Sequence, residues 1–178
     1  MSTRSIARCG VLVALLAASA WITVPLGPVP FTMQTFVLAL LPQVVSTRDA
    51  VFTVVVYLLL GAVGVPVFSG FQGGLGVLMG PTGGYLLGFA AGMPVAGAVA
   101  HADVLPRRAR GVTAGIALLA VSYTLGTLQL MNVYGIDAPA ALAVAVVPFV
   151  VPDVVKVAMS VGVAERINRA LGAVAEGR

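Results

Sequence analysis

The sequence predicts an all-α membrane protein in which six transmembrane helices form one bundle and both termini are cytoplasmic. Of its 178 residues, 60% are hydrophobic and only 9% are charged, whereas about 25% of the residues of a soluble domain are charged. At roughly 20 residues per span, the length suits a single membrane domain, 1–178. Six apolar runs are recognisable, at about 6–24, 33–45, 50–65, 85–100, 112–130 and 140–167.

The distribution of arginine gives the orientation. Counted along the six runs, every arginine falls on one side of the membrane: Arg4, Arg8, Arg48, Arg107, Arg108, Arg110, Arg166, Arg169 and Arg178. The opposite connections, 25–32, 66–84 and 131–139, contain neither lysine nor arginine. Because cytoplasmic loops carry the excess of basic residues, this pattern predicts a multi-pass protein of the cytoplasmic membrane. Anchoring beside membrane lipid explains the net charge of +4, so we expect no nucleic-acid partner.

The first apolar run follows Arg4 and Arg8, as in a signal peptide. It leads into a proline-rich segment with further spans behind it, so we expect a retained first helix. Ala14 and Ala18 form a small-xxx-small pair on this helix, which would let a second helix approach closely; packing inside the protein is the alternative. The second run is short, so the proline-rich segment before it is predicted to dip into the protein as a lid.

A glycine-rich segment, 67–84, connects the third and fourth runs. Seven of its eighteen residues are glycine and none is charged. Uncharged irregular backbone at membrane depth is tolerated where it is buried in protein or lines a cavity. It lacks the spacing and the lysine of a phosphate-binding loop. We therefore expect it to approach a ligand through its backbone; a flexible external linker is the alternative.

The last run contains an acid and a base, Asp153 and Lys156, preceded by Pro148 and Pro152. A charged side chain at the bilayer centre costs roughly 3 kcal/mol on the insertion scale, so two are retained there only for a compensating gain. Residues three apart share one face of a helix, which predicts contact between the two side chains. We interpret them as the floor of an outward-facing cavity; a purely structural ion pair is the alternative.

The two side chains are chemically complementary to one kind of ligand. A carboxylate only accepts hydrogen bonds and an ammonium only donates them, so together they match a ligand edge with both N–H and C=O, such as a urea or an amide. Lys156 could instead pair with a ligand carboxylate. Phe31, Phe71 and Met79 are candidate apolar walls, and the Tyr123 hydroxyl needs a partner if it is buried.

Several motifs resemble the biotin-transporter S component family, the vitamin-binding subunits of energy-coupling factor transporters. The two most specific are Gly-Gly-Leu-Gly-Val-Leu-Met-Gly-Pro-Thr-Gly-Gly-Tyr at 73–85 and Pro-Asp-Val-Val-Lys at 152–156. The likeness extends to 29–35, 57–68 and Tyr123 with 125–127. The resemblance implies high-affinity binding of biotin from outside and its uptake across the membrane. It also implies a transmembrane coupling subunit and two ATPase subunits as partners.

The same resemblance assigns roles to residues. It implies that Ala14 and Ala18 contact the coupling subunit. The ureido ring of biotin would bind Asp153 and Lys156, and the remaining contacts would come from Gln72, Gly73, Gly74, Tyr85, Phe31 and Gln34.

The main alternative is an ion-coupled secondary transporter of a small polar metabolite, with Asp153 and Lys156 as a proton-linked pair. An enzyme is disfavoured because the sequence offers no metal-ligand set and no nucleophile–base constellation: Cys9 and His101 both lie at inner helix ends. We expect no cofactor and no metal. The chain carries no ATP-binding motif, so a partner or a gradient would have to drive transport.

Overall fold

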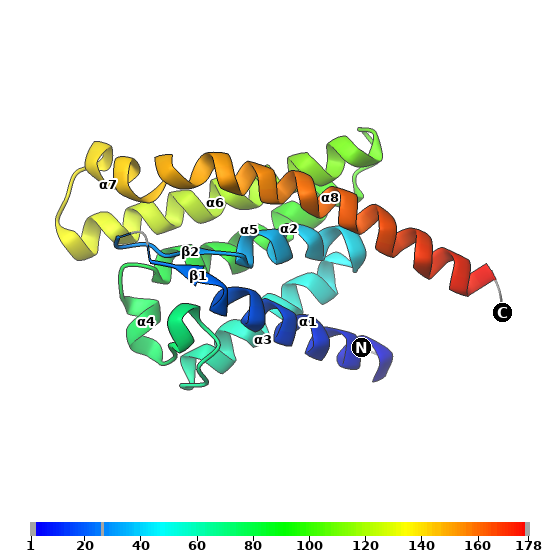
Figure 1. The fold of residues 1–178 in the computed structure, drawn as a ribbon, viewed down its shortest axis with the longest axis horizontal. Coiled ribbons are helices and arrows are strands. Elements are labelled where there is room, and N and C mark those ends of the chain that lie inside the picture. Colours follow the sequence, from blue (N-terminus) through cyan, green and yellow to red (C-terminus); the bar gives the residue numbers. More distant parts are fainter. Residues whose placement is uncertain (1–2, 26, 177–178) are drawn as a thin grey trace.

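The computed structural model describes residues 3–25 and 27–176 as a bundle of α-helices (Figure 1). The helices are α1 (Thr3–Trp21), α2 (Gln34–Val44), α3 (Thr47–Ala62), α4 (Leu75–Met79), α5 (Gly83–His101), α6 (Arg107–Tyr134), α7 (Ala138–Ala145) and α8 (Val147–Glu176). Two short strands, β1 (Thr23–Val24) and β2 (Phe31–Thr32), pair antiparallel, and a 3-10 turn, η1, covers Ser69–Phe71.

Four helices are long and apolar enough to cross a membrane: α1, α5, α6 and the part of α8 from Val147 to Ala173. The α2 helix is apolar but has 11 residues, and α3 has 16, which is roughly 24 Å at the helical rise per residue. The all-helical prediction is confirmed. The count of six spans remains a prediction.

Two of the differences between the helices and the predicted spans have a local structural cause. The first helix ends at Trp21 rather than near Val24, because residues 23 and 24 pair with β2. The last span is two helices, which meet at Val146 (φ −127°, ψ −55°). Pro148 therefore lies in the first turn of α8, where the missing N–H is not needed, and only Pro152 lies inside the helix.

The arginines gather at one end of the bundle. In Figure 1 the start of α1, the α2–α3 and α5–α6 connections and the end of α8 lie toward one end, whereas the β1–β2 hairpin, α4 and α7 lie toward the other. Arg178 lies outside the described residues. At the arginine-rich end Arg8 forms an ion pair with the buried Asp49, which also accepts a hydrogen bond from Ser5 (2.8 Å). These contacts join α1 to α3.

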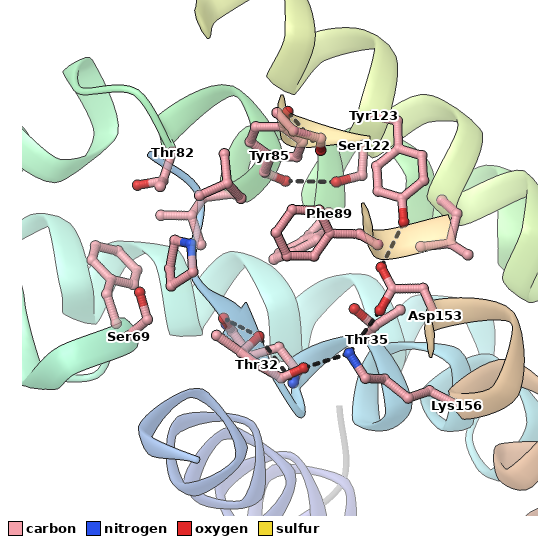
Figure 2. A pocket seen from close by; sticks show the side chains of 18 of the residues that line it. Thr32, Thr35, Ser69, Thr82, Tyr85, Phe89, Ser122, Tyr123, Asp153 and Lys156 are labelled. Atoms are coloured by element: carbon pink, nitrogen blue, oxygen red, sulfur yellow. Dashed lines mark hydrogen bonds and ion pairs between the residues drawn. The ribbon is translucent and has the colours of Figure 1, made fainter. Parts of the chain in front are cut away.

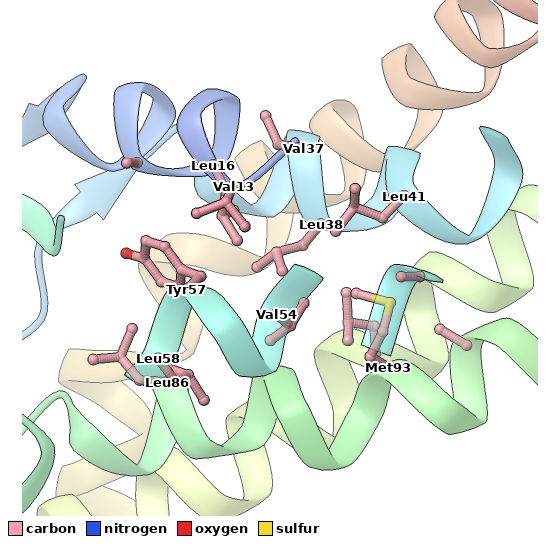
Figure 3. Close-up of a cluster of buried hydrophobic side chains, with 14 of the residues drawn as sticks. Val13, Leu16, Val37, Leu38, Leu41, Val54, Tyr57, Leu58, Leu86 and Met93 are labelled. Atoms are coloured by element: carbon pink, nitrogen blue, oxygen red, sulfur yellow. The ribbon is translucent and has the colours of Figure 1, made fainter. Parts of the chain in front are cut away.

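The main hydrophobic core lies between α1, α2, α3 and α5 (Figure 3). Leu16, Leu38 and Met93 are fully buried in it. The contact between α5 and α6 depends instead on glycine. A Cβ on Gly88 would lie 2.5 Å from the Ser122 Cα atom, so the two backbones approach more closely than a side chain permits.

The glycine-rich segment is fixed to three helices. The Trp21 indole on α1 donates to the Pro66 carbonyl (2.9 Å), and its ring stacks on Phe71. The Tyr57 hydroxyl on α3 donates to the Val67 carbonyl (3.0 Å). On α6, the Gln129 amide donates to the Leu78 and Gly80 carbonyls (2.8 and 2.7 Å). The segment is therefore part of the fold rather than an external linker.

Candidate ligand-binding site

The acid and base of the last span form an ion pair on one turn of α8. Lys156 Nζ lies 2.7 Å from Asp153 Oδ1, and both side chains are more than nine-tenths buried. The pair faces the inside of the bundle (Figure 2). The predicted contact between residues three apart on a helix is confirmed, and neither charge faces the exterior.

The second carboxylate oxygen of Asp153 is held from another helix. The Tyr123 hydroxyl, on α6, donates to Asp153 Oδ2 over 2.7 Å. This is the partner that a buried tyrosine hydroxyl was expected to need. With one donor on each oxygen, the plane of the carboxylate is fixed between α6 and α8. Its remaining lone pairs stay available as acceptors.

Lys156 also holds the N-terminal hairpin. Its ammonium donates to the Thr32 carbonyl of β2 over 2.7 Å and lies 3.7 Å from the centre of the Phe31 ring. Both distances are those of strong contacts, a charge-assisted hydrogen bond and a cation–π interaction. The proline-rich segment therefore reaches the charged pair, as the lid interpretation expected.

A cavity extends from this pair between the hairpin, α2, the glycine-rich segment, α5, α6, α7 and α8. About 650 Å³ of space that no protein atom fills lies within it, including open solvent at its mouth. Most of its wall is apolar, with polar groups at separate points, as in pockets for small molecules. The apolar wall includes Val29, Phe68, Val77, Phe89, Leu119 and Phe149. The polar lining comprises Thr32, Gln34, Thr35, Ser69, Thr82, Tyr85, Ser122, Tyr123, Asp153 and Lys156.

Two further predicted residues, Gln34 and Tyr85, line the cavity. The Gln34 amide donates to the Tyr57 hydroxyl (2.8 Å), and its oxygen accepts from the Thr32 hydroxyl (3.3 Å). The Tyr85 hydroxyl donates to the Ala145 carbonyl (3.3 Å) at the end of α7. Gln34 is thus tied to α3, and Tyr85 connects α5 to the break between α7 and α8.

The remaining predicted residues have other positions. Phe31 contacts Lys156. Gln72, Gly73 and Gly74 do not line this cavity. Gln72 and Gly73 border a neighbouring open hollow that shares Val77 and Thr82 with the cavity wall. The Gly74 N–H donates to the Gly61 carbonyl (2.6 Å). The glycine-rich segment reaches the cavity through Phe68, Ser69, Val77 and Thr82 instead.

The prediction that Phe71 and Met79 form apolar walls of the cavity is wrong. Phe71 is 63% exposed and Met79 is 76% exposed, and neither lines the cavity. Phe89 and Phe149 take this role. Helical spacing could have identified these two residues from the sequence. Phe89 lies four residues after Tyr85 and Phe149 lies four residues before Asp153, so each shares a helix face with a predicted site residue.

The arrangement suits binding rather than covalent chemistry. Its acceptor and donor stand side by side at one end of an apolar cavity, and the carboxylate is oriented in advance by Tyr123. Among the described residues no group of three His, Cys, Asp or Glu side chains could hold a metal ion.

The fold places the chain in a class. It matches the crystal structure of the S-component for biotin from an ECF-type ABC transporter with a TM-score of 0.84, covering 95% of each chain at 17% sequence identity. The chain is thus a multi-pass membrane protein with the S-component fold.

Sequence comparison gives the family. The BioY family model matches residues 1–173. A biotin transporter BioY of Thermotoga maritima is 41% identical over 93% of this chain and 96% of its own length. A probable biotin transporter BioY of Pyrococcus horikoshii is 37% identical over 94% and 98%. The chain belongs to the BioY family.

Proposed function

We propose that this protein binds biotin from outside the cell and acts in its uptake as the S component of an energy-coupling factor transporter. The observation that carries the proposal is the buried Asp153–Lys156 pair at the end of an otherwise mostly apolar cavity. Family membership supports it, because the relatives are named as biotin transporters. We assign the chain no enzymatic activity.

In the proposed complex the ureido ring of biotin lies on the charged pair. The ring presents N–H donors and one carbonyl acceptor, so its donors suit Asp153 and its carbonyl suits Lys156. A site that hydrogen-bonds polar groups rejects analogues that lack them, because its own buried groups are then left unpaired. The apolar body of the vitamin would lie against Phe89 and Phe149.

Other contacts follow from the residues around the cavity. Gln34 and Tyr85 are in reach of a ligand there, and Phe31 would cover it through the hairpin. Gln72, Gly73 and Gly74 remain proposed contacts that require the glycine-rich segment to shift on binding, since they now lie outside the cavity wall.

The proposed partners are a transmembrane coupling subunit and two ATPase subunits. Ala14 and Ala18 are exposed on α1, where two small side chains one turn apart would allow a helix of the coupling subunit to approach closely. We propose six spans with both termini cytoplasmic, because the arginine-rich end of the bundle then faces the cytoplasm. Lipid would surround the remaining apolar surface.

A second candidate is an ion-coupled secondary transporter, which the buried titratable pair favours. It predicts uptake that stops when the proton gradient is dissipated and needs no ATPase subunit. The S-component proposal predicts that uptake requires the ATPase subunits and continues without the proton gradient in cells that contain the coupling module.

Calorimetric titration of the purified protein tests the proposed substrate. Biotin, riboflavin and thiamine are titrated side by side into the same preparation. We expect saturable binding of biotin at one molecule per chain and no binding of the other two vitamins. If addition of biotin released no more heat than addition of buffer, biotin would not be the substrate.

A further inference from the structure

A buried tyrosine joins three elements around the proposed biotin cavity without lining that cavity. Tyr57, on α3, is fully buried in the main hydrophobic core (Figure 3). Its hydroxyl oxygen accepts a hydrogen bond from Gln34 Nε2 of α2 (2.8 Å), and its proton is donated to the Val67 carbonyl of the glycine-rich segment (3.0 Å). Gln34 lines the cavity and Tyr57 does not. Any effect of the Tyr57 hydroxyl on a ligand must therefore pass through a neighbouring residue.

Packing of the aromatic ring holds the Tyr57 hydroxyl in place. The ring meets the Phe68 ring edge to face, with the centroids 5.5 Å apart. Phe68 is itself buried and lines the cavity. It lies against the backbone of α3, because a Cβ on Gly61 would overlap its ring. The position of the hydroxyl is thus set by the core and not by its own hydrogen bonds alone.

The single proton of this hydroxyl determines which end of the Gln34 amide faces it. A tyrosine hydroxyl has one proton to donate, and the Val67 carbonyl receives it. Toward Gln34 the oxygen can therefore only accept a hydrogen bond, so the amide nitrogen must point at Tyr57. The amide oxygen then points at the Thr32 hydroxyl, which donates to it over 3.3 Å.

This orientation leaves defined groups of Gln34 for a ligand. A carboxamide has two N–H donors and an oxygen with two lone pairs. The contacts with Tyr57 and Thr32 use one of each. Because Gln34 lines the cavity and is only 4% exposed, the remaining N–H and lone pair are available to a molecule inside the cavity rather than to bulk solvent. Thr32 also accepts from Lys156 through its carbonyl, so the amide and the ammonium share one neighbour.

We propose that Tyr57 is a positioning residue for biotin binding, which fixes the Gln34 amide so that one N–H and one oxygen lone pair meet the ligand. The inference rests on the proposed function, because it names a further determinant of the same site. A donor and an acceptor on one side chain suit a polar ligand edge that carries both N–H and C=O. Without the Tyr57 hydroxyl the amide is free to rotate, and a ligand must then order it on binding.

A double-mutant cycle tests whether Tyr57 acts through Gln34. Tyr57→Phe removes the hydroxyl and keeps the ring, and Gln34→Met removes the amide and keeps a side chain of similar length. Calorimetric titration gives the Kd for biotin of the unchanged protein, both single variants and the double variant. We expect each single variant to raise the Kd roughly fivefold or more. In the Gln34→Met background, Tyr57→Phe should raise it by less than about twofold further, because the amide is already absent.

Thr53→Val is the matched control for loss of a buried hydroxyl. Thr53 lies one turn before Tyr57 on α3, is fully buried and donates to the Asp49 carbonyl (2.8 Å), but it does not line the cavity. We expect this variant to lower Tm and to leave the Kd unchanged. A purely structural role would give Tyr57→Phe the same result as Thr53→Val.

The outcomes separate this inference from the proposed function. No binding of biotin by the unchanged protein would overturn both. Binding by the unchanged protein together with an unaltered Kd in either single variant, or an equal rise from Tyr57→Phe in both backgrounds, would overturn the positioning role alone. If thermal unfolding shows that Tyr57→Phe does not fold, Gln34→Met decides: a weakened affinity supports the role of the amide, and an unaltered one overturns the inference.

Discussion

At the scale of single residues, Lys156 determines how the site can work. Its ammonium has three N–H donors, and the structure directs it at Asp153, at the Thr32 carbonyl and at the face of the Phe31 ring. A ligand carbonyl can therefore reach Lys156 only by replacing a contact with the hairpin. In the proposed complex, binding of the ureido ring and movement of β2 are therefore coupled through one side chain.

Replacing Lys156 with alanine should weaken biotin binding at least roughly tenfold. The variant removes the donor to the ligand and leaves Asp153 buried without its counter-ion, which costs several kcal/mol. Calorimetric titration measures the Kd, and thermal unfolding checks that the variant folds. Arg169→Ala removes an equal charge at an exposed position and should bind as the unchanged protein does. Unaltered affinity in Lys156→Ala would show that the ion pair is structural.

Tyr123→Phe tests the orientation of the carboxylate. The variant removes only the hydroxyl that donates to Asp153 Oδ2. Hydrogen bonds to charged groups contribute roughly 1.5–3 kcal/mol, so we expect the Kd for biotin to rise about tenfold or more. Tyr134→Phe changes an exposed tyrosine outside the cavity and is the matched control. Equal Kd values for the two variants would contradict a role for Tyr123 in the site.

At the scale of elements, the position of Tyr85 follows from how closely α5 and α6 pack. A Cβ on Gly126 would lie 2.3 Å from the Tyr85 ring, and one on Gly88 would meet the backbone at Ser122. The Ser122 hydroxyl in turn donates to the Tyr85 carbonyl (3.1 Å). Glycine at these positions therefore sets the depth at which the Tyr85 side chain enters the cavity.

Gly88→Ala should destabilise the protein. The added methyl group meets the Ser122 Cα at 2.5 Å, and overpacking of this kind costs roughly 1–3 kcal/mol. The expected fall in Tm is several degrees, about 2–4 °C per kcal/mol at this chain length. Gly162→Ala is the control, because a Cβ there meets nothing within 4 Å. A fall in Tm no larger than that of Gly162→Ala would mean that the helices are not in close contact at Gly88.

Contacts within one element can be predicted from the sequence, whereas contacts between distant elements cannot. Apolar periodicity and the acid–base spacing on one helix are local signals, so the helices and the Asp153–Lys156 contact were predictable. The pairing of β1 with β2 joins segments across a proline-rich turn, and the contact of Lys156 with Thr32 spans 124 residues. No local pattern specifies such contacts, which is why the sequence did not identify Phe68, Ser69, Val77 and Thr82 as the residues of the glycine-rich segment that line the cavity.

At the scale of the whole molecule, one end of the bundle is basic and the other carries the proposed binding site. The sequence predicted that the arginines lie on one side of the bundle, and the connections and helix ends that carry them in the described chain lie toward one end. The orientation of this end toward the cytoplasm remains a prediction. Ala145 and Phe149, on either side of the break between α7 and α8 at Val146, both line the cavity. That geometry arises from packing and not from composition.

The exposed face of α1 gives a prediction for the assembled transporter. Replacing Ala14 and Ala18 together with leucine should abolish co-purification with the coupling subunit, because two bulky side chains prevent close helix approach. Biotin binding by the isolated chain should be unchanged. Ala158→Leu alters an exposed alanine on α8 and should leave the complex intact. Intact assembly in the double variant would place the contact elsewhere.

The most direct test of the central claim is a crystal structure of the protein with biotin bound. We expect the ureido carbonyl within about 3 Å of Lys156 Nζ and a ureido N–H at a similar distance from the Asp153 carboxylate. Biotin found outside this cavity, or bound with its carboxylate on Lys156 and its ureido ring away from Asp153, would contradict the account.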